Sequence, residues 1–166
     1  MTGRQEPGTE APRLWNGLQP GAKVLVDTAP FIYLLEGHPQ FADQFTGLFE
    51  AAERGDLHLA LSTITLAEVL TGPLRAAQTA LAKRYEKALL QYHVVEVTPS
   101  IAALAAELRV SYGLKLPDAI HLATALDIGA TALVTQDRDF SRVNGIQILT
   151  GETEPVRRGK PPARRK

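Results

Sequence analysis

The apolar positions of the chain follow two different periods. Short β-branched or leucine-rich runs, bounded by Gly, Pro, Asp or Ser, are separated by longer stretches whose apolar residues recur with a helical spacing. The runs predicted to be strands are 23–27, 57–62, 94–97, 132–135 and 146–149. Strands that alternate with helices indicate βαβ units with right-handed crossovers. We therefore predict an α/β fold, a three-layer α/β/α sandwich with a central parallel sheet.

Capping residues help to delimit the predicted helices. Thr28 is suited to cap the first helix, and Gly37 to end it in a left-handed conformation. Glu68 stands three residues after Thr65, which is the spacing of a capping box. The predicted helices are 28–36, 39–54, 65–70, 74–91, 99–113 and 116–129.

The last of these helices, 116–129, is the most apolar. Pro117 suits its first turn and Gly129 its left-handed end. The apolar residues between them cover most of the helix circumference, which indicates packing on several sides. Asp118 is then held at the edge of a core, where it also complements the helix dipole.

Four acidic residues are predicted to meet at one edge of the sheet. Asp27 ends the first strand, and Glu68 lies in the helix after the second. Asp118 opens the helix before the fourth strand, and Asp137 follows that strand. Ligands bind at this edge of open parallel sheets. Clustered carboxylates repel one another, and Mg²⁺ or Mn²⁺ prefers such all-oxygen ligands. Two ions about 4 Å apart could stabilise both oxygens of a phosphodiester displacement.

Each acid also has a purely structural interpretation. Glu68 fits a capping box, Asp27 could be a turn or cap residue, and Asp137 with Asp139 could form a solvated turn. His121 lies one turn after Asp118 and could face the same site. A histidine in an otherwise apolar helix is more often a packed residue than a ligand, and the other histidines lack zinc-like spacing.

Composition narrows the class of protein. The chain of 166 residues has no cysteine, which excludes disulfides and thiolate metal sites. It shows no apolar run typical of a signal peptide or of a membrane span, so we expect a soluble, cytoplasmic protein. We expect one domain over 21–150 after a mostly disordered leader, 1–20, from which Leu14, Trp15 and Leu18 could fold back on the body.

Charge is distributed unevenly along the chain. Residues 21–150 carry 10 basic and 14 acidic residues, a net charge of −4, whereas 151–166 carry 6 and 2, a net charge of +4. We expect this basic tail to be disordered, either as a solvated end or as an additional contact to RNA phosphates. Other candidate phosphate contacts share one predicted helix, although a solvated helix face is the favoured interpretation: Arg75, Lys83, Arg84 and Lys87.

Four segments together resemble the acidic motifs of PIN domains, especially the ribonuclease toxins of the VapC type. They are VDTAPFIYLLE (26–36), STITLAEVL (62–70), LPDAIHLATAL (116–126) and LVTQDRDF (133–140). The resemblance implies an endoribonuclease with Mg²⁺ or Mn²⁺ as cofactor and Asp27, Glu68, Asp118 and Asp137 as catalytic metal-binding residues. Thr135 and Asp139 match supporting positions. The resemblance also implies an RNA substrate, a cognate antitoxin protein and a homodimer.

The clustering of the acids and the resemblance to PIN domains predict the same mechanism. A metal-activated water attacks phosphorus and displaces the 3′ oxygen. Two alternatives remain open: a catalytically silent protein-binding module of the same fold, and another metal-dependent phosphoryl-transfer domain. A receiver domain is disfavoured because no lysine ends the last strand. A dinucleotide-binding domain is disfavoured because DTAP, not a glycine-rich turn, follows the first strand.

Overall fold

The computed structural model describes Trp15 and residues 17–151. Most of the predicted leader, including Leu14, and the basic tail from residue 152 lie outside this part of the chain. None of the helices in the described part is long and apolar enough to cross a membrane. The elements are β1 (Ala22–Val26), α1 (Thr28–Glu36), α2 (Ala42–Glu53), β2 (Leu57–Ser62), α3 (Thr63–Arg75), α4 (Thr79–Leu89), β3 (His93–Val95), α5 (Pro99–Tyr112), α6 (Leu116–Asp127), β4 (Ala132–Val134), the 3₁₀ helix η1 (Arg138–Arg142) and β5 (Gln147–Leu149).

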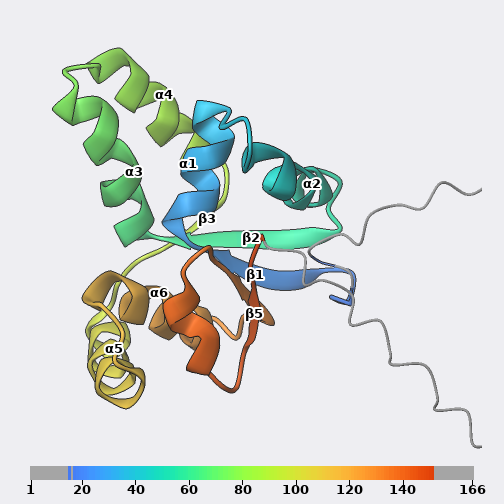
Figure 1. Ribbon diagram of the computed structural model, residues 1–166, viewed down its shortest axis with the longest axis vertical. Coiled ribbons are helices and arrows are strands. Elements are labelled where there is room, and N and C mark those ends of the chain that lie inside the picture. Colours follow the sequence, from blue (N-terminus) through green and yellow to red (C-terminus); the bar gives the residue numbers. More distant parts are fainter. Residues whose placement is uncertain (1–14, 16, 152–166) are drawn as a thin grey trace, which may run out of the picture.

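The strands form one parallel sheet in the order β3-β2-β1-β4-β5. β1 lies at its centre, where Val24 pairs with Leu59 of β2 and with Ala132 of β4. Helices α1 to α4 cover one face of the sheet, and α5, α6 and η1 cover the other (Figure 1). This arrangement confirms the predicted three-layer α/β/α sandwich. It also brings the carboxyl ends of β1, β2 and β4 to one edge.

The core is divided in two by the sheet. Val24 and Val26 of β1 pack with α1, α2 and α3, whereas Leu25 between them packs with α5 and α6. This alternation follows from the two-residue period of a strand. Helix α6 carries the buried residues Ala119, Leu122, Ala123 and Ala125, so its predicted packing on several sides is confirmed. The short side chains let α6 lie close to the sheet.

Two capping predictions were wrong. Helix α1 is capped by Asp27, not Thr28, because the Asp27 carboxylate accepts a hydrogen bond from the Thr28 backbone N–H. Helix α3 is capped by Ser62, whose hydroxyl accepts a bond from the Ile64 N–H, so the helix begins before Thr65. Thr65 is buried inside the helix, and it forms no capping box with Glu68.

The predicted break between the third and fourth helices also lies further along the chain. Helix α3 continues to Arg75 and includes Pro73 in its last turn, where a proline costs only one helical hydrogen bond. The chain turns at Ala77, which has a positive φ of 56°. Gly37, Gly113 and Gly129 have the left-handed conformation expected at helix ends.

Two apolar residues ahead of β1 pack on the body of the protein. Trp15 and Leu18 contact the core cluster on the α1–α4 side of the sheet. The Trp15 ring lies directly over Gly47 of α2, where an added Cβ would come within 2.3 Å of the ring. Gly47 is therefore required for this close approach of the indole.

Candidate active site

Asp27 links the central strand to two other elements at the carboxyl edge of the sheet. Its Oδ1 atom accepts the Thr28 backbone N–H at 2.6 Å, and its Oδ2 atom accepts the Thr135 hydroxyl at 2.7 Å. Thr135, which follows β4, is fully buried and also accepts the Asp137 N–H at 3.0 Å. Both carboxylate oxygens of Asp27 therefore have hydrogen-bond donors, and Thr135 lies in the supporting position that the sequence predicts.

Glu68 reaches the same edge from the second turn of α3. Its Oε2 atom accepts a short hydrogen bond from the Thr28 hydroxyl and lies 3.4 Å from His121 Nε2. The contact with His121 is the largest effect on the pKa of Glu68, and it lowers that pKa together with the Thr28 bond, against partial burial. The predicted acid is present at the site, and Thr28, which the sequence analysis considered only as a helix cap, contacts it.

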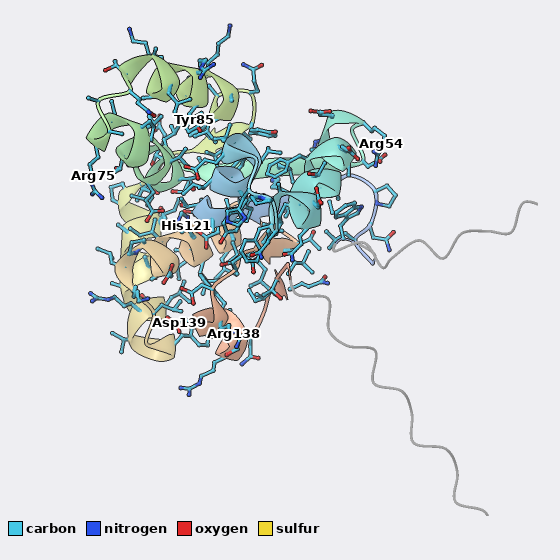
Figure 2. All side chains as sticks on the ribbon, turned by 45° about the horizontal axis from the view of Figure 1, so that its top comes forward. Arg54, Arg75, Tyr85, His121, Arg138 and Asp139 are labelled. Atoms are coloured by element: carbon cyan, nitrogen blue, oxygen red, sulfur yellow. The ribbon has the colours of Figure 1, made fainter. Side chains whose placement is uncertain are left out.

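His121, labelled in Figure 2, lies between these two acids. Its Nε2 atom is 3.2 Å from Asp27 Oδ1, while the ring is fully buried. Burial lowers the pKa of His121, but the bond to Glu68 and the charges of Asp27, Glu68 and Asp118 outweigh it, so the pKa lies above its ordinary value. The histidine is packed, as expected of this helix, yet it faces carboxylates. Its i, i+3 spacing from Asp118 was the signal for this position.

Three further acids form the other half of the site. Oxygens of Asp118, Asp137 and Asp139 lie within 4.8 Å of one another. Asp137 accepts the Asp139 N–H at 2.8 Å, and exposed Lys115 lies 3.8 Å from Asp139. The two groups of acids interact electrostatically. Burial is the largest effect that raises the pKa of Asp118 to about 6, and the charges of Asp27 from the first group and Asp137 from the second follow.

The residues fit a hard divalent cation. Asp118 Oδ2 is buried and has no hydrogen-bond partner in the described part of the chain. A buried carboxylate oxygen without a donor is costly, and burial and the neighbouring charges of Asp27 and Asp137 raise the pKa of the same carboxyl group. The surrounding donors are carboxylate oxygens, which suit Mg²⁺ or Mn²⁺. The acids at 27, 68, 118 and 137 are therefore brought to one edge, with Asp139 beside them.

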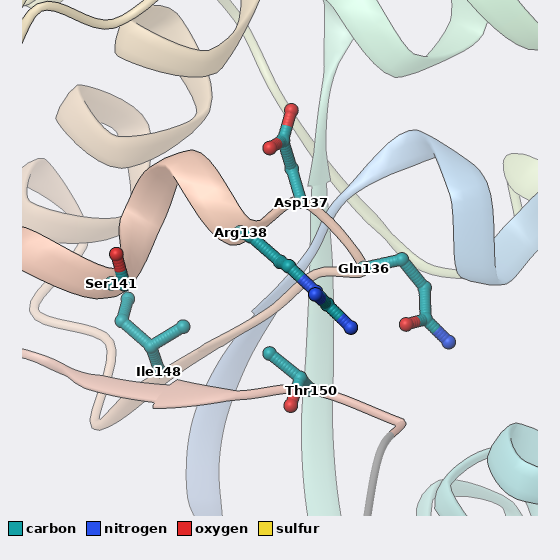
Figure 3. Close-up of a pocket in the computed structure, with 6 residues that line it drawn as sticks. All are labelled: Gln136, Asp137, Arg138, Ser141, Ile148 and Thr150. Atoms are coloured by element: carbon teal, nitrogen blue, oxygen red, sulfur yellow. The ribbon is translucent and has the colours of Figure 1, made fainter.

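A pocket of about 330 Å³ opens next to this group of acids. Asp137 belongs to both, and Figure 3 shows the exposed Arg138 side chain extending between Gln136 and Thr150. The Gln136 amide donates to Gln44 at 3.3 Å. The pocket is lined by Gln136, Asp137, Arg138, Ser141, Ile148 and Thr150. It therefore combines the guanidinium of Arg138, several polar groups and the aliphatic side chain of Ile148.

The sequence matches the family model of the PIN domain over residues 24–146. The chain therefore belongs to the PIN domain family, and the structure has the fold of VapC toxins. A chain of a toxin–antitoxin complex from Klebsiella pneumoniae is 32% identical, with a TM-score of 0.63 over 78% of this chain and 98% of the other. VapC20 of Mycobacterium tuberculosis, a sarcin-ricin loop cleaving toxin, is 20% identical, with a TM-score of 0.63 over 76% and 98%. VapBC of Salmonella typhimurium, solved with DNA, is also 20% identical, with a TM-score of 0.62 over 78% and 98%. No curated protein matches the sequence.

Proposed function

We infer that the protein is a Mg²⁺- or Mn²⁺-dependent endoribonuclease, the toxin of a type II toxin–antitoxin pair acting in the cytoplasm. One observation carries the inference: Asp118 has a buried oxygen with no hydrogen-bond partner in the described part of the chain, and it lies among carboxylates that belong to two other segments. This arrangement is unfavourable without a cation and favourable with one. A catalytically silent module would have no need to retain so costly a cluster.

The residues of the chain divide the work. Asp27, Glu68, Asp118 and Asp137 would hold the cation, and Thr28 and Thr135 orient two of these acids. A bound divalent cation lowers the pKa of water and stabilises negative charge on a phosphodiester. No hydroxyl or thiol nucleophile is required, and Thr135, the buried hydroxyl beside Asp27, is already engaged in two hydrogen bonds.

The pocket beside Asp137 is suited to hold the RNA strand. Arg138 offers a guanidinium to a backbone phosphate next to the acids, and the polar lining can contact a nucleotide. The basic residues considered on α3 and α4 are exposed, and Figure 2 shows Arg75 at the end of the molecule away from Arg138. The pocket is therefore the better candidate for RNA contact.

One of the comparisons supports the proposed protein partner. The 32% identical chain from Klebsiella pneumoniae belongs to a toxin–antitoxin complex, and almost its whole length is matched. This likeness supports a cognate antitoxin for the present protein. The homodimer implied by the family resemblance is part of the same proposal, and sedimentation of the purified protein tests it.

The nuclease activity can be tested with single-stranded RNA. We expect cleavage with Mg²⁺ or Mn²⁺ and none in EDTA, with recovery when excess metal is restored. Asp27→Asn, purified in parallel, controls for contaminating ribonuclease, since it loses a charge that the cation needs. Equal cleavage by wild type and Asp27→Asn, or undiminished cleavage in EDTA, would contradict the proposal.

The pocket makes a separate prediction about binding. In the Asp27→Asn background, Arg138→Ala should flatten the slope of log K against log salt for single-stranded RNA by about 0.7, the loss of one phosphate contact. In the active enzyme, the same change should raise KM more than it lowers kcat. Arg142→Ala is the matched control, because Arg142 is exposed on the same helix η1 but does not line the pocket. Equal slopes for the two variants would remove Arg138 from the RNA contact.

A further inference from the structure

The buried imidazole of His121 has one polar side and one unpaired side. Nε2 lies 3.2 Å from Asp27 Oδ1 and 3.4 Å from Glu68 Oε2, and both are within hydrogen-bonding reach. Nδ1 is buried and has no hydrogen-bond partner in the described part of the chain. The three side chains come from α6, from the end of β1 and from α3, so the imidazole joins elements that are distant in the sequence.

These contacts determine where the ring proton resides. A lone pair on Nε2 would face two carboxylate oxygens and be repelled, whereas an Nε2–H group donates to them. Placing the proton on Nδ1 instead would leave a buried donor without an acceptor. Nε2 therefore carries a proton whether the ring is neutral or charged.

The same geometry bears on a second interpretation of the cluster. Asp27, Glu68 and His121 have ligand atoms within 4.8 Å of one another and could be taken for a three-ligand metal site. A metal-ligating histidine needs a lone pair on the liganding nitrogen, and it almost always donates its other N–H to a partner. Among the described residues, His121 Nδ1 has no acceptor to receive such a bond. The imidazole is thus poorly arranged to bind metal through Nε2.

We propose that His121 is a positioning residue, which uses its Nε2–H group to hold Asp27 and Glu68 in place for the cation without ligating it. Thr28 and Thr135 complete the same hydrogen-bond network from the other sides of the two acids. Asp118, whose Oδ2 atom has no donor, is left to face the cation directly. This role rests on the proposed metal-dependent function and adds a residue of defined chemistry to it.

Two substitutions separate positioning from ligation. His121→Gln can keep an N–H donor near the Nε2 position, and His121→Leu keeps a similar volume without a donor. The thermal stability of the full chain is measured at increasing concentrations of Mg²⁺, Mn²⁺ or Co²⁺, so the readout is metal affinity and not cleavage. If His121 is a positioning residue, His121→Leu should weaken the binding of all three ions by a similar factor of about 10 to 100. His121→Gln should largely restore their binding.

Ligation predicts a different pattern. Imidazole favours Co²⁺ and Mn²⁺ over Mg²⁺. If His121 were a ligand, its loss would weaken Co²⁺ binding far more than Mg²⁺ binding, and the ratio of the two affinities would change at least tenfold. That change in ratio would overturn the proposal. Thr124→Val is the matched control, because it removes another buried polar group of α6, whose hydroxyl donates to the Ile120 carbonyl. It should leave metal affinity unchanged.

The proton itself can be located by nitrogen NMR of the histidine ring, which remains informative if His121→Leu does not fold. We expect a proton on Nε2 both before and after Mg²⁺ is added. A ring protonated only on Nδ1 would overturn the proposal.

Absence of any metal stabilisation of the wild type would overturn the proposed function and this role together. A stabilised wild type with an equally stabilised His121→Leu variant would overturn this role alone.

Discussion

Asp118→Asn should make the metal-free protein more stable and at the same time abolish its response to Mg²⁺ and Mn²⁺. Burial and two neighbouring charges raise the pKa of Asp118 to about 6, so at pH 7 its ionised form is held at a cost. A pKa of about 6 in place of the ordinary 3.8 corresponds to roughly 3 kcal/mol, but Asp118 is partly exposed and solvent screens much of this energy. We expect a gain on the order of 1 kcal/mol, or about 2–4 °C in Tm.

The loss of the metal response should be larger than this gain. A ligand at one hundred times its Kd stabilises a protein by about 2.7 kcal/mol, and the variant should lose that stabilisation along with RNA cleavage. Calorimetry in EDTA and in saturating Mn²⁺ measures both effects. Asp127→Asn is the control, since Asp127 is exposed at the other end of α6 and its change should fall within about 0.5 kcal/mol. If Asp118→Asn retains the wild-type metal response, Asp118 does not hold the cation.

The fold explains why the sequence alone could place the acids at one edge of the sheet. Asp27 follows directly after a β-branched run, and Asp118 stands in the first turn of an apolar helix, so the fold class alone determines the edge at which each residue lies. Parallel strands all end at that edge. Convergence of acids from four distant segments therefore follows from topology, without knowledge of any side-chain contact.

The hydrogen-bond partners of these acids could not be obtained in this way. Thr28 bonds to Glu68 across 40 positions, and His121 contacts Glu68 across 53. Both contacts depend on how α1, α3 and α6 pack, which a pattern of apolar residues does not specify. The same holds for the start of α3, where Thr65 and Glu68 have the spacing of a capping box, but Ser62, the last residue of β2, is the cap.

The metal-free protein should lose stability as the pH rises from about 4.5 to above 6.5. The pKa of Asp118 is about 6 in the folded protein against an ordinary value of 3.8, so the native state binds more protons than the unfolded chain across that interval. Stability falls with pH wherever the native state binds more protons. The pKa of His121 is also raised, which contributes stability below pH 6.5 that is lost as the pH passes through the folded value.

Glu68 acts in the opposite sense but in a different interval. Its pKa is lowered from 4.5, so it contributes stability above that pH that is lost as the pH falls through its folded value. Between about pH 4.5 and 6 the effect of Asp118 should therefore prevail.

Saturating Mn²⁺ should remove the decline, because the cation binds the ionised acids, and the stabilisation by metal should grow with pH. Thermal unfolding from pH 4.5 to 8 in EDTA and in Mn²⁺ measures this difference. In Asp118→Asn the decline between pH 4.5 and 6 should disappear, while the part above pH 6.5 that belongs to His121 persists, and an unchanged profile in the variant would assign the decline to other groups.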